Sequence, residues 1–101
     1  MNSSSESQIQ EALHANREEV LRLATPLRAV QLRVLMAEAS IRRRDLYDVE
    51  FVAEVSAGVD LSMILRVAHE LEQVLRCRVH IHDLLVDCED NRIARKESVP
   101  L

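Results

Sequence analysis

The sequence has a single glycine among its 101 residues and no long apolar run. No uninterrupted apolar stretch approaches the roughly 20 residues that cross a bilayer, and the opening MNSSSESQIQ lacks an apolar signal region. Cysteine is also scarce. Cys77 and Cys88 form no CxxC pair and no zinc-finger spacing, which favours reduced thiols and leaves a disulfide open. These absences predict an intracellular, cytoplasmic protein with no membrane partner.

Positive charge is not in excess either. Lysine and arginine number 13 against 17 aspartates and glutamates, and the net charge is -4. A main partner that is free nucleic acid or an anionic membrane would favour a basic surface. We therefore expect a protein or small-molecule partner and no direct contact with nucleic acid. The chain length predicts one domain over residues 1–101, with residues 1–6 flexible.

Hydrophobic periodicity predicts helices and strands in alternation. The expected elements, in chain order, are a helix over 7–24 that ends before Pro26, a strand over 28–36, a short helix or loop over 37–46, a strand over 47–55, a turn at Gly58, a helix over 61–75, a strand over 77–86 and a short helix that ends before Pro100. In the first strand, Val30, Leu32 and Val34 share one face. This order predicts an α+β fold, a small mixed β-sheet packed with helices.

The helix over 61–75 has the broadest apolar face. Asp60 is its expected N-cap. The residues expected to line its core face are Leu61, Ile64, Leu65, Ala68, Leu71 and Leu75. Further apolar residues lie beside that face at Met63, Val67 and Val74. This surplus indicates either deep burial or an interface.

Acidic residues alternate with apolar ones in YDVEFVAEV, residues 47–55. Residues two apart on a strand point to the same face, so Asp48 and Glu50 can converge on one divalent cation. His80 could complete the set if its strand lies beside the acidic one, as a strand, helix, strand connection usually places it. An oxygen and nitrogen set of this kind would accept magnesium, manganese or zinc. The alternative is that this row of acids is the solvated face of an ordinary strand.

Nearly the whole chain, from about Ile9 to Leu101, resembles the minimal nucleotidyltransferases, small relatives of the polymerase-beta-type nucleotidyltransferase fold. The segment IQEALHANREEVLRL resembles the opening helix of that family. VQLRVLMAEASIRRRDLYDVEFVAEV is similar to its first strand, glycine-serine turn, connecting segment and acidic strand. GVDLSMILRVAHELEQVLRCRVHIH is similar to its long helix and the strand after it, and NRIARKESVPL to its closing short helix. The resemblance implies a nucleotidyltransferase-like fold of the polymerase-beta palm type.

The residues that carry the chemistry of this family are altered in this chain. The resemblance places Met36 and Ala37 where active members have the Gly-Ser pair that holds the phosphates of the nucleotide. Asp48 and Glu50 correspond to the Asp-x-Asp metal pair, and His80 falls at the position of a third acid. The phosphate cradle therefore lacks its hydroxyl and the close backbone approach that glycine allows. The resemblance implies that any metal site is weakened and that catalysis is lost.

A basic corner stands beside these positions. The resemblance places Ser40 and Ile41 where the family has an arginine and a glycine, and Arg42, Arg43 and Arg44 follow directly. This corner could bind phosphate in place of the missing cradle, or it could be a solvated loop.

Members of the family often act as antitoxins beside a HEPN-type ribonuclease toxin, some by adenylylating it and others by binding. The resemblance thus implies a catalytically degenerate protein-interaction module, an antitoxin subunit or a homo-oligomer. The enzyme alternative is an adenylyl transferase in which Asp48 and Glu50 hold Mg²⁺ or Mn²⁺ with ATP. A third hypothesis, a metal-sensing module, would use Asp48, Glu50, His80 and His82.

Overall fold

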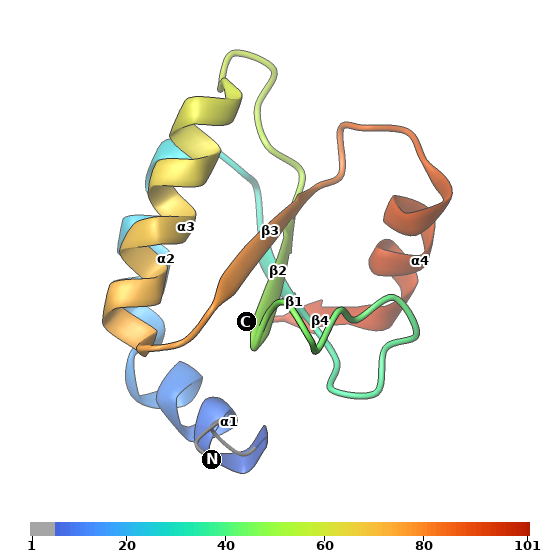
Figure 1. The fold of residues 1–101 in the computed structure, drawn as a ribbon. Helices are drawn as coiled ribbons and strands as arrows, with labels where there is room; N and C mark the ends of the chain where they lie inside the picture. The colour runs from blue at the N-terminus through green and yellow to red at the C-terminus, as the bar shows by residue number, and fades with distance from the viewer. Residues whose placement is uncertain (1–5) are drawn as a thin grey trace.

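The computed structural model describes residues 6–101, an α+β domain built on one sheet (Figure 1). Its elements are α1 (Glu6–Ala15), α2 (Arg17–Leu23), the 3-10 turn η1 (Thr25–Leu27), β1 (Leu32–Leu35), β2 (Val49–Ala53), α3 (Leu61–Leu75), β3 (Val79–Asp83), α4 (Glu89–Glu97) and β4 (Ser98–Pro100). The predicted fold class is confirmed. Residues 1–5 of the segment expected to be flexible lie outside this description, and Glu6 is the first residue of α1. Across residues 6–101, no helix combines the length and apolar character needed to cross a membrane.

The sheet is mixed, with the strand order β3-β2-β1-β4. β1 pairs antiparallel with both β2 and β4, and β2 pairs parallel with β3. The parallel pair is connected through α3, the crossover that the sequence predicts. The register sets Glu50 opposite His80 and Val52 opposite His82, so the acidic strand and the histidine strand are neighbours as expected.

The two faces of the sheet are covered differently. Helices α1, α2 and α3 lie on one face and enclose the larger core, in which Phe51 is completely buried (Figure 1). The opposite face carries a smaller core, where Val52 packs with Leu84, the residue after β3, and with Ala94 of α4. Side chains alternate between the faces along a strand, so Glu50 points to the same side as Val52, away from the three helices.

The predicted first helix is two helices. A break at Asn16 separates α1 from α2. The side-chain amide of Asn16 donates to the carbonyl oxygen of Ala12 at 2.8 Å, a local bond of the kind by which asparagine competes with regular helix. The chain then passes through η1, which contains Pro26, and ends it with Arg28 in a left-handed conformation at φ 54. The predicted stop at proline is confirmed, and the continuity of the helix before it is wrong.

The first strand begins later than the sequence predicts. β1 starts at Leu32, whose partner Ala53 is the last residue of β2, so β2 does not extend opposite residues 28–31. Val30 is therefore not on the core face with Leu32. It is fully exposed, at 101% of its reference area, and is the most exposed of the large apolar side chains described.

Helix α3 has the predicted boundaries but a narrower buried face. Asp60 caps it, because its carboxylate accepts a bond from the amide of Met63 at 3.0 Å. The buried residues are Ile64, Val67, Leu71 and Leu75. Leu61 and Leu65, predicted in the core, are 67% and 60% exposed. They are four residues apart and so share one stripe of the helix, which faces away from the sheet.

Residues 37–46 form turns, so of the short helix and the loop that the sequence allows, the loop is confirmed. β3 ends at Asp83 and is shorter than predicted. The final helix α4 is present, but it is followed by β4, which the sequence does not predict. β4 pairs antiparallel with β1, with Val99 opposite Val34.

Candidate functional site

Glu50 is the buried centre of the candidate site. It is the second residue of β2, is 1% exposed, and points to the sheet face that carries the connecting loop 36–48. The solvated-face interpretation of the acidic row is therefore wrong for this residue. It holds for Glu54, beyond the end of β2, which is exposed as expected.

The carboxylate of Glu50 is bonded on both oxygens. Its Oε2 accepts from Nε of Arg42 at 2.9 Å and from the backbone amide of Arg43 at 2.8 Å, and its Oε1 is 2.9 Å from Nε2 of His82. Burial raises the pKa of Glu50, but the contacts with His82, Arg43 and Arg42 outweigh it, and the net pKa lies below the usual value. Glu50 is thus an ionised carboxylate whose charge is balanced inside the protein.

Arg42 is almost as buried as its partner. Its side chain is only 4% exposed. Besides Glu50, its guanidinium donates from Nη2 to the backbone oxygen of Asp48 at 3.0 Å. Of the three arginines in the predicted basic corner, Arg42 therefore points inward and holds the loop against β2. Arg43 and Arg44 are exposed to solvent.

Asp48 is held by a different arginine. Its Oδ2 accepts from the backbone amide of Arg78 at 2.8 Å and from Nε at 3.1 Å, and its Oδ1 accepts from Nη2 at 3.1 Å. The hydrogen bonds from Arg78 are the main cause of the lowered pKa of Asp48. This two-pronged contact joins the start of β2 to the start of β3.

His80 stands opposite Glu50 in the sheet but does not bond to it. Its ring stacks on Tyr47 with centroids 4.7 Å apart and meets the ring of His82 edge-on at 4.6 Å. Burial is the main cause that lowers the pKa of His80, so the ring is neutral near neutral pH. His82, two residues further along β3, is the histidine that contacts the acid.

A metal ion does not fit this arrangement as it stands. Across the described residues 6–101, no group of three or more histidine, cysteine, aspartate or glutamate side chains is disposed to hold one. The carboxylates of Asp48 and Glu50 already accept from Arg78 and Arg42, and a guanidinium and a divalent cation compete for the same lone pairs. The site of Asp48, Glu50 and His80 with Mg²⁺ or Mn²⁺ and ATP stays a prediction that this geometry does not favour.

The predicted phosphate cradle is also occupied by contacts within the chain. The amide of Met36 donates to the backbone oxygen of Glu97 at 3.1 Å, and the backbone oxygen of Ala37 accepts from Arg44. A little further on, the amide and the hydroxyl of Ser40 both donate to Oε1 of Glu97, at 2.9 and 3.0 Å. The Glu97 carboxylate of α4 thus accepts hydrogen bonds from the amide and hydroxyl of Ser40, which are donors of the kind that bind phosphate.

The sequence did not predict the side chains that bond to Glu50, Asp48 and Ser40. These are Arg42, Arg78 and Glu97, respectively. One signal was present for Arg42, because a charged residue inside a buried strand requires a counter-charge and the nearest basic residues are those of the corner at 42–44. Nothing local marks Glu97 or Arg78, because their partners lie 57 and 30 positions away.

Comparison with known proteins agrees with this architecture. No protein-family model matches the chain, and no curated protein is significantly similar to it. A solved structure named as a minimal nucleotidyltransferase, an assignment that its own name marks as provisional, superposes with a TM-score of 0.70 at 29% sequence identity. The match covers 90% of this chain and 94% of that one.

The mixed sheet, the crossover through α3 and this structural match define a protein with a nucleotidyltransferase-like α+β fold. Within that class, the chain resembles the minimal nucleotidyltransferases over nearly its whole length, as the sequence predicts.

Proposed function

We propose that this nucleotidyltransferase-like domain is a catalytically degenerate protein-interaction module, the antitoxin partner of a HEPN-type ribonuclease toxin. The observation that carries the proposal is the buried ion pair between Arg42 and Glu50, 2.9 Å apart. An arginine there supplies the positive charge that a metal ion would supply in an enzyme, but it cannot grip a triphosphate while both side chains are withdrawn from solvent.

Restoring a metal site would cost the fold a buried contact. A cation on Glu50 would have to displace Arg42, leaving a guanidinium that is 4% exposed without its partner. Breaking one side of a buried ion pair costs about 3–5 kcal/mol. Phosphoryl-transfer chemistry depends on metal electrostatics and positioning, so an enzyme would have to recover that cost from binding its nucleotide.

The phosphate side of the site supports the same proposal. Met36 and Ala37 offer no hydroxyl, and the amide of Met36 is already bonded to Glu97. The Glu97 carboxylate on Ser40 would repel the phosphates of an incoming nucleotide. The fold is intact while the nucleotide-holding groups are engaged elsewhere, which is the pattern expected of a binding module.

We include self-association in the proposal. Leu61 and Leu65 form an exposed apolar stripe on the outer face of α3, and such stripes commonly mark protein contacts. Sedimentation equilibrium of the wild type beside a Leu61→Ser, Leu65→Ser double variant tests this part. A monomer at all concentrations in both proteins would contradict it.

The transfer reaction is tested directly. The purified chain is incubated with ATP labelled at the α-phosphate and a HEPN-type toxin, with Mg²⁺ and separately with Mn²⁺. We expect no labelled toxin above a blank without the chain. Robust labelling that is lost in Asp48→Ala and kept in Glu38→Ala, an exposed acid used as the control, would overturn the degenerate assignment in favour of the enzyme alternative.

Binding to the toxin is measured separately. The chain and the toxin are co-expressed, and both toxin inhibition and co-purification are recorded. We expect inhibition without added nucleotide, and the same inhibition by Asp48→Asn, because the proposed mechanism is occlusion and not modification. Failure of the two proteins to associate, with both folded, would contradict the antitoxin role.

A further inference from the structure

Val30 separates two pockets at the end of the sheet remote from Asp48. One pocket, of about 350 Å³, is lined by Val30 and Leu84 together with the polar and charged side chains of Gln31, Arg33, Glu54 and Arg95. The other, of about 400 Å³, is lined by Val30 together with mainly apolar side chains. We call the two pockets and the valine between them the Val30 surface. Val30 is 101% exposed, and a partner that covers it removes apolar surface from water, which favours binding.

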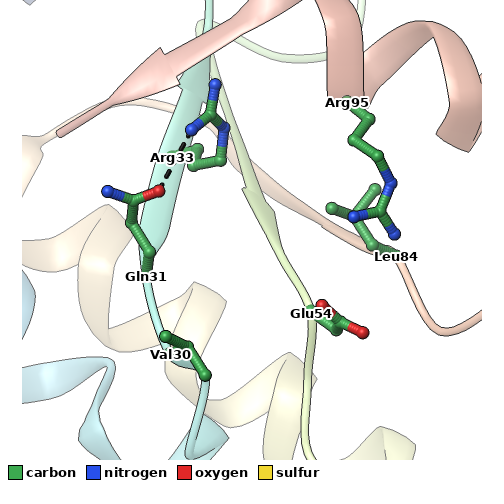
Figure 2. Close-up of a pocket in the computed structure, with 6 residues that line it drawn as sticks. All are labelled: Val30, Gln31, Arg33, Glu54, Leu84 and Arg95. Carbon is green, nitrogen blue, oxygen red and sulfur yellow. Dashed lines mark hydrogen bonds between the residues drawn. The ribbon is translucent and has the colours of Figure 1, made fainter.

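The charged pocket brings together side chains from three elements. Figure 2 shows Arg33 of β1, Arg95 of α4 and Glu54 beyond β2 around one opening. Arg33 is fixed in place, because Nε donates to Oγ of Ser98 at 2.8 Å, Nη2 to the Ser98 backbone oxygen at 2.6 Å and Nη1 to Gln31 at 3.0 Å. Its guanidinium is therefore a preorganised donor, which lowers the entropy cost of binding an anionic group.

Arg95 and Glu54 complete the pocket. Both are exposed, and neither takes part in an ion pair described for residues 6–101. The opening therefore has a surplus of one positive charge, although the chain as a whole carries -4. That local reversal of sign is the complementarity that an acidic partner requires.

The second pocket supplies an apolar contact beside the charged one. Leu21, Leu27 and Ala29 contribute to its wall, and Arg28 is the charged residue that lines it. Arg28 adds a further cation close to Val30. An occupant that spans both pockets thus meets an apolar hollow, a projecting valine and a cationic hollow in succession.

We propose that the Val30 surface is the docking site for a protein segment that carries acidic and apolar side chains. This inference rests on the proposed function, since it names the surface through which the interaction module contacts a partner. An apolar side chain of the segment enters the pocket of Leu21 and Leu27. A carboxylate of the same segment binds Arg95 and Arg33.

Glu54 argues against a nucleotide at this surface. A polyphosphate would bring several negative charges beside its carboxylate, whereas a protein segment can place one acid on the arginines and a neutral or basic residue near Glu54. The surface is also distinct from the Glu50 cluster. Glu54 lies four residues after Glu50 in the chain, about 13 Å at the usual rise of an extended chain.

The test is an NMR titration of the isotope-labelled full chain with defined peptides. The probe is an acetylated, amidated alanine-based peptide with two glutamates and two leucines, and the matched control replaces the glutamates by lysines. ATP and inorganic phosphate are separate arms. No toxin is used and no transfer is measured, so failure of this proposal and failure of the proposed function give different results.

We expect saturable shifts at Val30, Gln31, Arg33 and Glu54 with the acidic peptide, and affinity about tenfold lower for the lysine peptide, as expected for loss of a charge-assisted contact. Arg95→Glu should remove this preference. Lys96→Glu, which makes the same charge change at the next, exposed position and lines neither pocket, should keep it.

Three results would overturn the proposal. Shifts with ATP or phosphate that exceed those with the peptide would assign the surface to a small anion. Shifts that depend on protein concentration alone would assign it to a second copy of the chain. Equal binding of the acidic and lysine peptides, or no shift at these residues with either, would remove the role of the arginines.

Discussion

Arg42 and Glu50 form an ion pair of 2.9 Å in which both side chains are withdrawn from solvent. The pair joins the loop after β1 to the second residue of β2, and it uses one of the two acids that the sequence offers as metal ligands. Stability, pH response and the degenerate site all depend on this relationship.

Arg42→Met should destabilise the protein by about 3–5 kcal/mol, because it leaves the buried Glu50 carboxylate without its counter-charge. Urea unfolding followed by circular dichroism measures the change. Arg66→Met, on the exposed side of α3, should alter the free energy of unfolding by less than about 0.5 kcal/mol.

Glu50→Gln added to Arg42→Met should recover much of that loss. An uncharged pair removes the unpaired carboxylate and keeps a hydrogen-bonding group beside His82, and replacing both members of a buried pair is commonly far less costly than replacing one. If the double variant is as unstable as Arg42→Met, the loss comes from packing around the loop and not from the buried charge.

Acid should weaken the fold through Asp48 and Glu50. The pKa of each lies below its usual value in the folded protein, so their contribution is complete above the unfolded values of about 4. It is lost as the pH falls from there through the lowered native values. The free energy of unfolding of the wild type should thus fall as the pH is lowered below about 4, and the fall should be shallower in Asp48→Asn. Parallel curves for the two proteins would exclude Asp48 as a contributor.

The two thiols should differ in reactivity. Burial raises the pKa of Cys77 to about 11, and the thiol is half-buried, whereas Cys88 is exposed at the N-cap of α4. Because the thiolate is the reactive form, iodoacetamide at pH 8 should modify Cys88 well before Cys77, as peptide mass spectrometry can follow. Equal rates in the native protein would show that the segment around Cys77 opens readily.

Asp60→Ala should cost about 1 kcal/mol, the usual effect of losing an N-cap, because the Met63 amide loses its acceptor. Thermal unfolding is sufficient to detect it. Ser62→Ala, in the same first turn and without a capping role in the described contacts, provides the control. A loss in Ser62→Ala as large as that in Asp60→Ala would argue against the cap.

What the sequence predicts correctly here has a local cause. The start of α3 at Leu61 follows from the Asp60 cap, and the neighbouring positions of β2 and β3 follow from the tendency of a strand, helix, strand connection to place its two strands side by side. The α+β class follows from the order of the elements, and the resemblance to minimal nucleotidyltransferases from their spacing.

The errors have non-local causes. Leu61 and Leu65 satisfy the apolar period of α3, but the sheet reaches only the stripe of Ile64 and Val67. β4 is three residues long and exists because β1 accepts it. The site was the least predictable part. The fold of the turn at residues 37–46 decides which arginine pairs with Glu50, and the sequence of that turn does not indicate which side chain points inward.

The two strands that pair with β1 are synthesised at very different times. β2 follows it closely in the chain, whereas Ser98, which bonds to Arg33, is 65 positions away. During synthesis on the ribosome, the edge of β1 that will accept β4 is therefore open until the segment 98–100 has emerged. An open edge of this kind can pair with other extended chains, so the nascent protein passes through a stage in which a chaperone, or an early-binding partner, has a strand to protect.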